Sequence, residues 1–104
     1  MNQEIEFTNY LHIYAQSDWH APAHIIGSKL SLTTLRDAIN QALESGDGKC
    51  ESFTNDGEGF DAVVIRVDDP KQFVKMHVPY MLDIAKEKPS DAFDKLITRV
   101  ERKQ

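Results

Sequence analysis

The sequence predicts an α+β fold: a two-layer domain in which an antiparallel sheet of about four strands is backed by helices, in the order β-β-α-β-β-α. Three observations carry this prediction. Residues 9–15 alternate as a strand does, residues 60–67 contain a β-branched run, and residues 31–46 have apolar side chains at helical spacing. Strands and helices in this order favour an antiparallel sheet with helices against it.

Length and composition indicate an ordinary globular chain. It has 104 residues, so we predict a single domain over residues 1–104. Apolar residues make up 40% and charged residues 28% of the chain, which is sufficient for one core. The single Cys50 cannot form an intramolecular disulfide, and this favours a reducing, cytoplasmic location.

Charge and hydropathy exclude two classes of partner. The formal net charge of −5 opposes nucleic-acid binding, because that binding depends on Lys and Arg contacts to phosphates. The first residues lack the basic start and apolar run of a secretory signal. No apolar stretch approaches the roughly 20 residues of a membrane span. We therefore expect neither a nucleic-acid partner nor a membrane partner.

The first predicted elements are two strands joined by a long connection. In residues 9–15 (NYLHIYA), Leu11 and Ile13 alternate with polar or aromatic side chains, a period of two that is typical of a strand. Residues 17–22 (SDWHAP) then combine Ser, Asp and Pro, and residues 24–28 (HIIGS) form a short β-branched segment. This pattern predicts a β-hairpin.

The middle of the chain predicts a helix followed by a second hairpin. In residues 31–46, Ser31 is the expected N-terminal cap and Gly46 the expected stop. Residues 50–54 (CESFT) and 60–67 (FDAVVIRV) are expected to pair with each other. The apolar centre of the second segment predicts a central strand rather than an edge strand.

The last third predicts helices divided by a proline. Residues 69–70 (Asp-Pro) have the pattern of a cap and first helical residue, whereas Pro79 would interrupt a helix that continued through it. Residues 71–78 fit either a turn of helix or an extended segment. Residues 80–87 predict a short helix. Residues 90–103 predict a terminal amphipathic helix, whose first residue, a serine, is the expected cap.

The segment DGEG, residues 56–59, allows two interpretations. Asn, Asp and Gly between two strand segments are typical of a tight hairpin turn. Alternatively, the loop faces a ligand, since two glycines permit close backbone approach and the side chains of Asp56 and Glu58 can accept hydrogen bonds. The spacing excludes an EF-hand, and the strand that follows excludes both a Walker loop and a dinucleotide fingerprint.

A second candidate site is the connection between the first two strands. Trp19, the only tryptophan, is followed by His20, and His24 comes four residues later. Trp19 can lie over the core or present a flat face for stacking. Pro22 opposes the helix that would place both histidines on one face, so we predict no metal site. We find no nucleophile motif, and we predict no catalytic residue and no cofactor.

Several short elements of the sequence resemble those of a family of small bacterial and phage proteins: Trp19-His20, Gly27, residues 32–43 (LTTLRDAINQAL), residues 56–59 (DGEG) and Val78-Pro79-Tyr80. The resemblance spans most of the chain. It implies a bacterial or phage cytoplasmic setting, and it implies that the Trp-His and DGEG segments act together. It implies no activity.

The functional hypothesis is a non-enzymatic binding module. Trp19, His20 and His24, together with Asp56 and Glu58, would form one recognition surface for a protein partner or for a second copy of the chain. One alternative is a small-molecule site, in which a nucleotide-like ligand stacks on Trp19 and is bound by Asp56 or Glu58. Another is a hydrolase or lyase with His20 or His24 as base, which requires a carboxylate or hydroxyl within about 3 Å of the ring.

Overall fold

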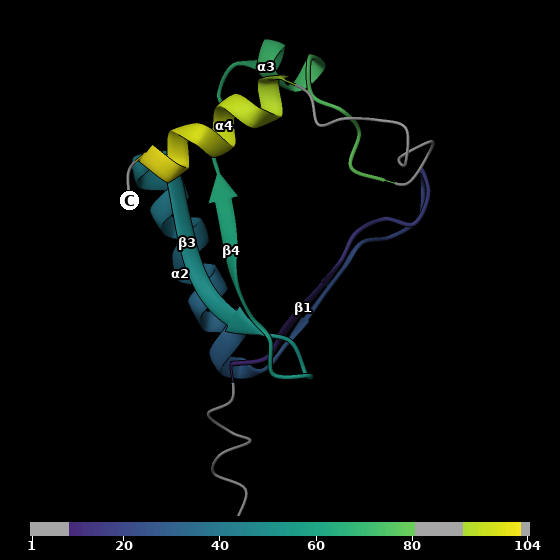
Figure 1. The fold of residues 1–104 in the computed structure, drawn as a ribbon, viewed down its shortest axis with the longest axis vertical. Coiled ribbons are helices and arrows are strands. Elements are labelled where there is room, and N and C mark those ends of the chain that lie inside the picture. Colours follow the sequence, from purple (N-terminus) through teal and green to yellow (C-terminus); the bar gives the residue numbers. More distant parts are fainter. Residues whose placement is uncertain (1–8, 81–90, 103–104) are drawn as a thin grey trace, which may run out of the picture. The chain divides into compact units, whose positions relative to one another are not determined.

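The computed structural model describes residues 9–80 and 91–102, and it confirms the α+β class (Figure 1). The elements are β1 (Leu11–Tyr14), β2 (His24–Gly27), α2 (Lys29–Ser45), β3 (Asp47–Phe53), β4 (Gly59–Ile65), α3 (Pro70–Val74) and α4 (Asp91–Arg102). The described residues form two compact units. One contains residues 9–14 and 23–66, and the other contains residues 15–22, 67–80 and 91–102. No helix within these ranges is both long and apolar enough to cross a bilayer.

The first unit contains two antiparallel hairpins instead of the predicted four-stranded sheet. β1 pairs with β2, so that Tyr14 lies opposite His24, and β3 pairs with β4. The hairpins meet at an isolated parallel bridge between Tyr10 and Phe53. β4 is therefore an edge strand in a two-stranded sheet, not the predicted central strand. A run of apolar residues indicates that a strand is buried. Here helix α2, and not a further strand, packs against β4.

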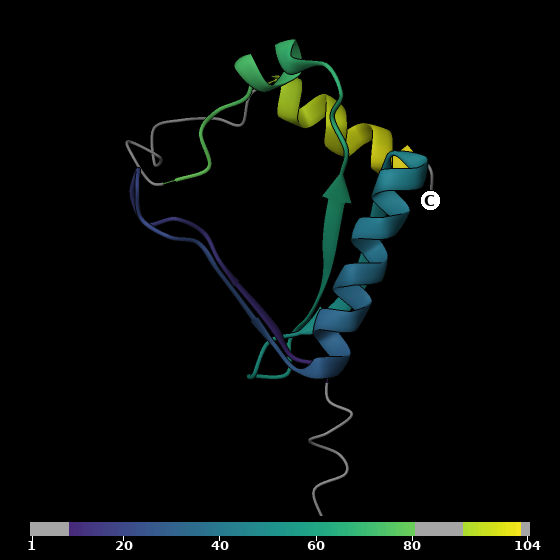
Figure 2. The same cartoon turned by 180° about the vertical axis from the view of Figure 1, so that it is seen from behind.

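Helix α2 runs along one face of the β3–β4 hairpin (Figures 1 and 2). The buried core consists of Leu11, Leu35 and Ala62, and the partly buried Cys50, Phe60 and Val64 pack against it. The helix lies close against the backbone of β3 at Gly48, where a Cβ atom would lie 2.1 Å from the carbonyl oxygen of Ala38. A glycine is therefore required at this contact.

Ser28, not the predicted Ser31, caps α2. The Ser28 hydroxyl oxygen accepts a hydrogen bond from the backbone N–H of Ser31 at 3.1 Å. Ser31 is instead buried in the first turn, where its hydroxyl donates to the carbonyl oxygen of Tyr10. Both serines are good caps, and the helix begins at the earlier one because β2 ends directly before it. The helix ends at Gly46 as predicted, with φ of 102°.

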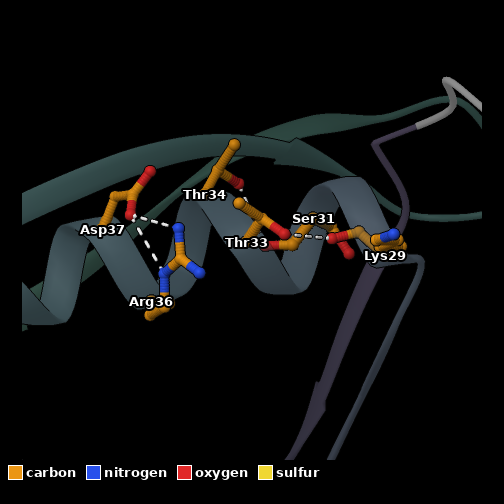
Figure 3. Close-up of polar contacts among 6 residues, drawn as sticks. All are labelled: Lys29, Ser31, Thr33, Thr34, Arg36 and Asp37. Atoms are coloured by element: carbon orange, nitrogen blue, oxygen red, sulfur yellow. Dashed lines mark hydrogen bonds and ion pairs between the residues drawn. The ribbon is translucent and has the colours of Figure 1, made fainter.

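Polar side chains in the first half of α2 are bound locally (Figure 3). The Thr33 hydroxyl donates to the carbonyl four residues earlier at 2.7 Å, and the Thr34 hydroxyl donates to the carbonyl of Ser31 at 2.9 Å. Arg36 and Asp37 form an ion pair at 3.0 Å. Both partners are exposed, so this pair contributes at most about 1 kcal/mol.

In the second unit, α3 begins as predicted. The Asp69 carboxylate accepts a hydrogen bond from the N–H of Lys71 at 3.0 Å, and Pro70 is the first helical residue. The helix ends at Val74. Residues 71–78 therefore contain a helical turn followed by non-helical backbone, which resolves the ambiguity of their pattern.

The terminal helix α4 confirms the prediction of a helix near the end of the chain. Leu96 and Val100, from its apolar stripe, are buried. Phe93 packs edge to face on the His77 ring, with the ring centroids 5.2 Å apart. The helix predicted over residues 80–87 and the predicted serine cap of α4 lie outside the described residues, apart from residue 80.

Candidate functional site

Residues 56–58 of the DGEG segment lie in the connection between β3 and β4, and Gly59 is the first residue of β4. The N–H of Gly57 donates to the carbonyl of Thr54 at 3.0 Å, and the N–H of Thr54 donates to the carbonyl of Glu58 at 2.9 Å. Gly57 has φ of 90°, in the left-handed region that glycine adopts at little cost. The segment is therefore the hairpin turn that the sequence predicts.

The Asp56 carboxylate bonds back onto its own loop. One of its oxygens accepts hydrogen bonds from the Thr54 hydroxyl and from the N–H of Glu58, the latter at 3.2 Å. These two bonds, the Thr54 bond first, hold the pKa of Asp56 below its ordinary value. The carboxylate thus accepts two hydrogen bonds from its own loop while remaining exposed to solvent.

His12 links this loop to the other hairpin. Its Nε2 atom lies 3.1 Å from the backbone nitrogen of Asn55, and its Nδ1 atom lies 2.6 Å from the Tyr14 hydroxyl. Because Asn55 donates its N–H, Nε2 must be the acceptor, and the hydrogen-bond pattern assigns the remaining ring proton of the neutral imidazole to Nδ1. The His12 and Tyr14 rings also meet edge to face at 5.7 Å. A neutral imidazole therefore joins β1 to the β3–β4 loop.

The strand register places His24 on the same face as His12. Tyr14 lies opposite His24, and His12 lies opposite Ile26. Directly paired residues of an antiparallel sheet project from the same face, so these four side chains share one face of the β1–β2 hairpin. The structure thus brings the predicted His24 onto the face that binds the loop containing Asp56.

Large apolar or aromatic side chains are exposed on both faces of the β1–β2 hairpin. They are between 41% and 60% exposed, and we call them the hairpin surface: Tyr10, Ile13, Tyr14, Ile25 and Ile26. Residues 9–16 and 23–28 contain no Lys, Arg, Asp or Glu. Clustered apolar exposure of this kind, without charge, is a common feature of the interaction surfaces of soluble proteins.

Trp19 and His20 lie in the connection between β1 and β2, which belongs to the second unit. The turn is held by a hydrogen bond from the N–H of Ala21 to the carbonyl of Asp18 at 3.1 Å. Trp19 is 62% exposed. Its ring is 4.6 Å from the His20 ring, and His20 has φ of 72°, a left-handed conformation that histidine adopts more readily than most residues.

The five predicted site residues are divided between the two units. His24, Asp56 and Glu58 belong to the first, whereas Trp19 and His20 belong to the second. A recognition surface shared by the Trp-His and DGEG loops therefore stays a prediction. The alternative of a small-molecule site at Trp19 also stays a prediction.

Sequence reasoning did not select His12 or Tyr14. Their alternation along a strand was a signal that they share a face, but the bond to Asn55 joins residues 43 apart in sequence. The enzymatic alternative requires a hydroxyl or carboxylate close to the ring of His20 or His24. The Tyr14 hydroxyl lies beside the ring of His12, and the enzymatic alternative at His20 or His24 stays a prediction.

Neither metal geometry nor known relatives identify the site further. Within residues 9–80 and 91–102, no group of three or more His, Cys, Asp or Glu side chains is placed to hold a metal ion. Comparisons with protein-family models, with curated proteins and with solved structures find no match.

Replacing Thr54 with valine should raise the pKa of Asp56, because the Thr54 hydroxyl is the largest cause of its lowering. A depressed pKa stabilises the folded chain above the ordinary carboxyl value of about 3.9, and this contribution is lost as the pH falls through the depressed value. Thr54→Val should therefore reduce the contribution that ionised Asp56 makes to the free energy of unfolding above that pH. An NMR titration of the Asp56 carboxyl measures the shift, with Thr33→Val on α2 as control. An unchanged titration in Thr54→Val would show that the hydroxyl does not bond the carboxylate.

Proposed function

We propose that the chain is a non-enzymatic polypeptide-binding module whose recognition surface is the hairpin surface, with the DGEG loop as its polar rim. The observation that supports this most is the exposure of large apolar side chains on both faces of one hairpin. A two-stranded hairpin is at best marginally stable alone in water. A polypeptide packed on it would remove this apolar surface from water, which favours association.

The contact of His12 supports the choice of the DGEG loop as the rim. The hydrogen bond from Asn55 to His12 holds the loop against the face that carries Tyr14 and Ile26. Recognition surfaces commonly combine an apolar centre rich in tyrosine with a polar rim. The exposed carboxylate of Asp56 supplies negative charge at that rim.

Helix α2 presents a competing set of exposed apolar side chains, Leu32, Ile39 and Leu43. The hairpin is the stronger candidate because α2 is already packed on β3–β4 through its buried face, whereas the hairpin exposes apolar side chains on both faces. Leu43 provides a matched control, since Leu43 and Ile26 are each 60% exposed.

Photo-crosslinking in cells that produce the protein tests the proposal. A photoreactive phenylalanine derivative in place of Ile26 should give a discrete crosslinked product, with a second copy or with another protein. We expect that product to be at least about ten times more abundant than the product of the same substitution at Leu43, because binding energy concentrates in the centre of an interface. No product at Ile26, or equal products at both positions, would contradict the proposal.

A further inference from the structure

The outer edge of β2 is open within the described residues. The N–H of Ser28 donates to the carbonyl of Tyr10 at 3.1 Å. Backbone groups along a strand point alternately to either side, so those of His24 and Ile26 point to β1 and those of Ile25 point outward. β2 belongs to a two-stranded sheet, and its outward-pointing groups are therefore available to another strand.

This edge lacks the features that normally prevent strand pairing between chains. Residues 23–28 contain no lysine, no other formal charge and no proline, and β2 pairs with β1 in regular register without a bulge. Ile25 and Ile26 are β-branched, which favours an extended backbone. Two copies, each with a formal net charge of −5, repel each other electrostatically. This repulsion is weakest where the uncharged hairpins meet.

We propose that two copies of the chain pair antiparallel along the outer edges of β2, about a two-fold axis at Ile25, and form a four-stranded sheet in the order β1-β2-β2-β1. This inference rests on the proposed function and names a second copy as the polypeptide that is bound.

The register follows from the symmetry. A two-fold axis perpendicular to the sheet places the same face of both copies on the same side. Directly opposite residues of an antiparallel pair must project from the same face. One residue must therefore lie directly opposite its own counterpart in the second copy, with the axis between them. We place Ile25 at this position because its backbone groups point outward. Ile25 and the partner's Ile25 then exchange both hydrogen bonds. An axis further along the strand would bring the second strand against the start of α2, which follows β2 after a single residue.

The side chains in this register form a continuous apolar row. Ile13 lies opposite Ile25 on one face of the hairpin. Across the four strands of the dimer, the row is therefore Ile13, Ile25, the partner's Ile25 and the partner's Ile13. The edge pairing brings only β2, with Ile25 at its centre, directly against the partner. Standard interfaces bury about 800 Å² on each partner. The edge alone supplies less than that, and we expect a reversible dimer that dissociates at micromolar concentration.

Sedimentation equilibrium of the purified full chain tests the dimer. The average mass should rise from 11.8 kDa toward twice that value between about 1 and 500 μM. Ile25→Lys places two like charges at the axis and should raise the dissociation constant at least about tenfold. Ile25→Val should retain the dimer, as should Leu43→Lys, which adds the same charge at a similarly exposed position. A monomer at every concentration, or a dimer that Ile25→Lys leaves unchanged, would overturn the inference.

Disulfide trapping tests the register. Under oxidation, Ile25→Cys should crosslink two copies, because the paired Cα atoms would be about 5.5 Å apart. Ile13→Cys lies on the same face with similar exposure, but the two copies would be roughly 14 Å apart there and should not crosslink. The unchanged chain, with Cys50, is the baseline. Equal crosslinking by both variants would overturn the register.

Sedimentation and crosslinking together distinguish the absence of the dimer from the absence of any bound polypeptide. A purified monomer whose Ile26 position crosslinks to a different protein in cells would overturn the dimer and support the binding module. A monomer without any crosslink at Ile26 would overturn both.

Discussion

Replacing Gly48 with alanine should lower the free energy of unfolding by about 3 kcal/mol, because an added methyl group has no room where α2 meets β3. The new Cβ atom would lie 2.1 Å from the carbonyl oxygen and 3.0 Å from the carbonyl carbon of Ala38. These are backbone atoms in the middle of a helix, so relief requires α2 to move. Urea unfolding followed by circular dichroism measures the loss.

Gly59→Ala is the matched control in the same hairpin. Its Cβ atom would approach the ring of Phe53 at 3.2 Å, and that side chain is partly exposed and able to shift. We expect a loss below about 1 kcal/mol. A Gly48→Ala variant as stable as this control would show that α2 does not lie against β3 in the way described.

Replacing Leu11 with alanine should lower the free energy of unfolding by about 2 to 5 kcal/mol. Leu11 is fully buried and forms the core together with Leu35 and Ala62, so truncation removes apolar contacts and leaves a cavity. Ile13→Ala, on the same face of the same strand, removes a half-exposed side chain and should cost less than about 1 kcal/mol. Equal losses in the two variants would contradict the placement of the core at the start of β1.

The elements that could be predicted are those whose signals are local. Gly46 ends α2 and Gly57 forms the turn between β3 and β4, and both have positive φ, which other residues adopt only with strain. Asp69 and Pro70 begin α3 as cap and first helical residue. In each case the residues that determine the local structure are neighbours in the sequence, and the prediction is confirmed.

Contacts between distant segments could not be predicted in the same way. The alternation in β1 shows that Leu11 and Ile13 share a face, but it does not show that only Leu11 reaches the core. Whether two hairpins merge into one sheet depends on tertiary pairing, and here they meet at the single bridge between Tyr10 and Phe53. The bond between His12 and Asn55 depends on the same meeting of hairpins, which explains why the candidate site was only partly predicted.

Hydrogen exchange can show whether another polypeptide covers the hairpin surface. The protein would be isolated gently from the cells that produce it and compared with the same protein after dissociation by extensive dilution. Coverage of this surface predicts that the amides of residues 10–14 and 24–27 exchange at least about ten times faster after dissociation, while those of α2 do not change. Identical exchange in β1 and β2 before and after dissociation would contradict it.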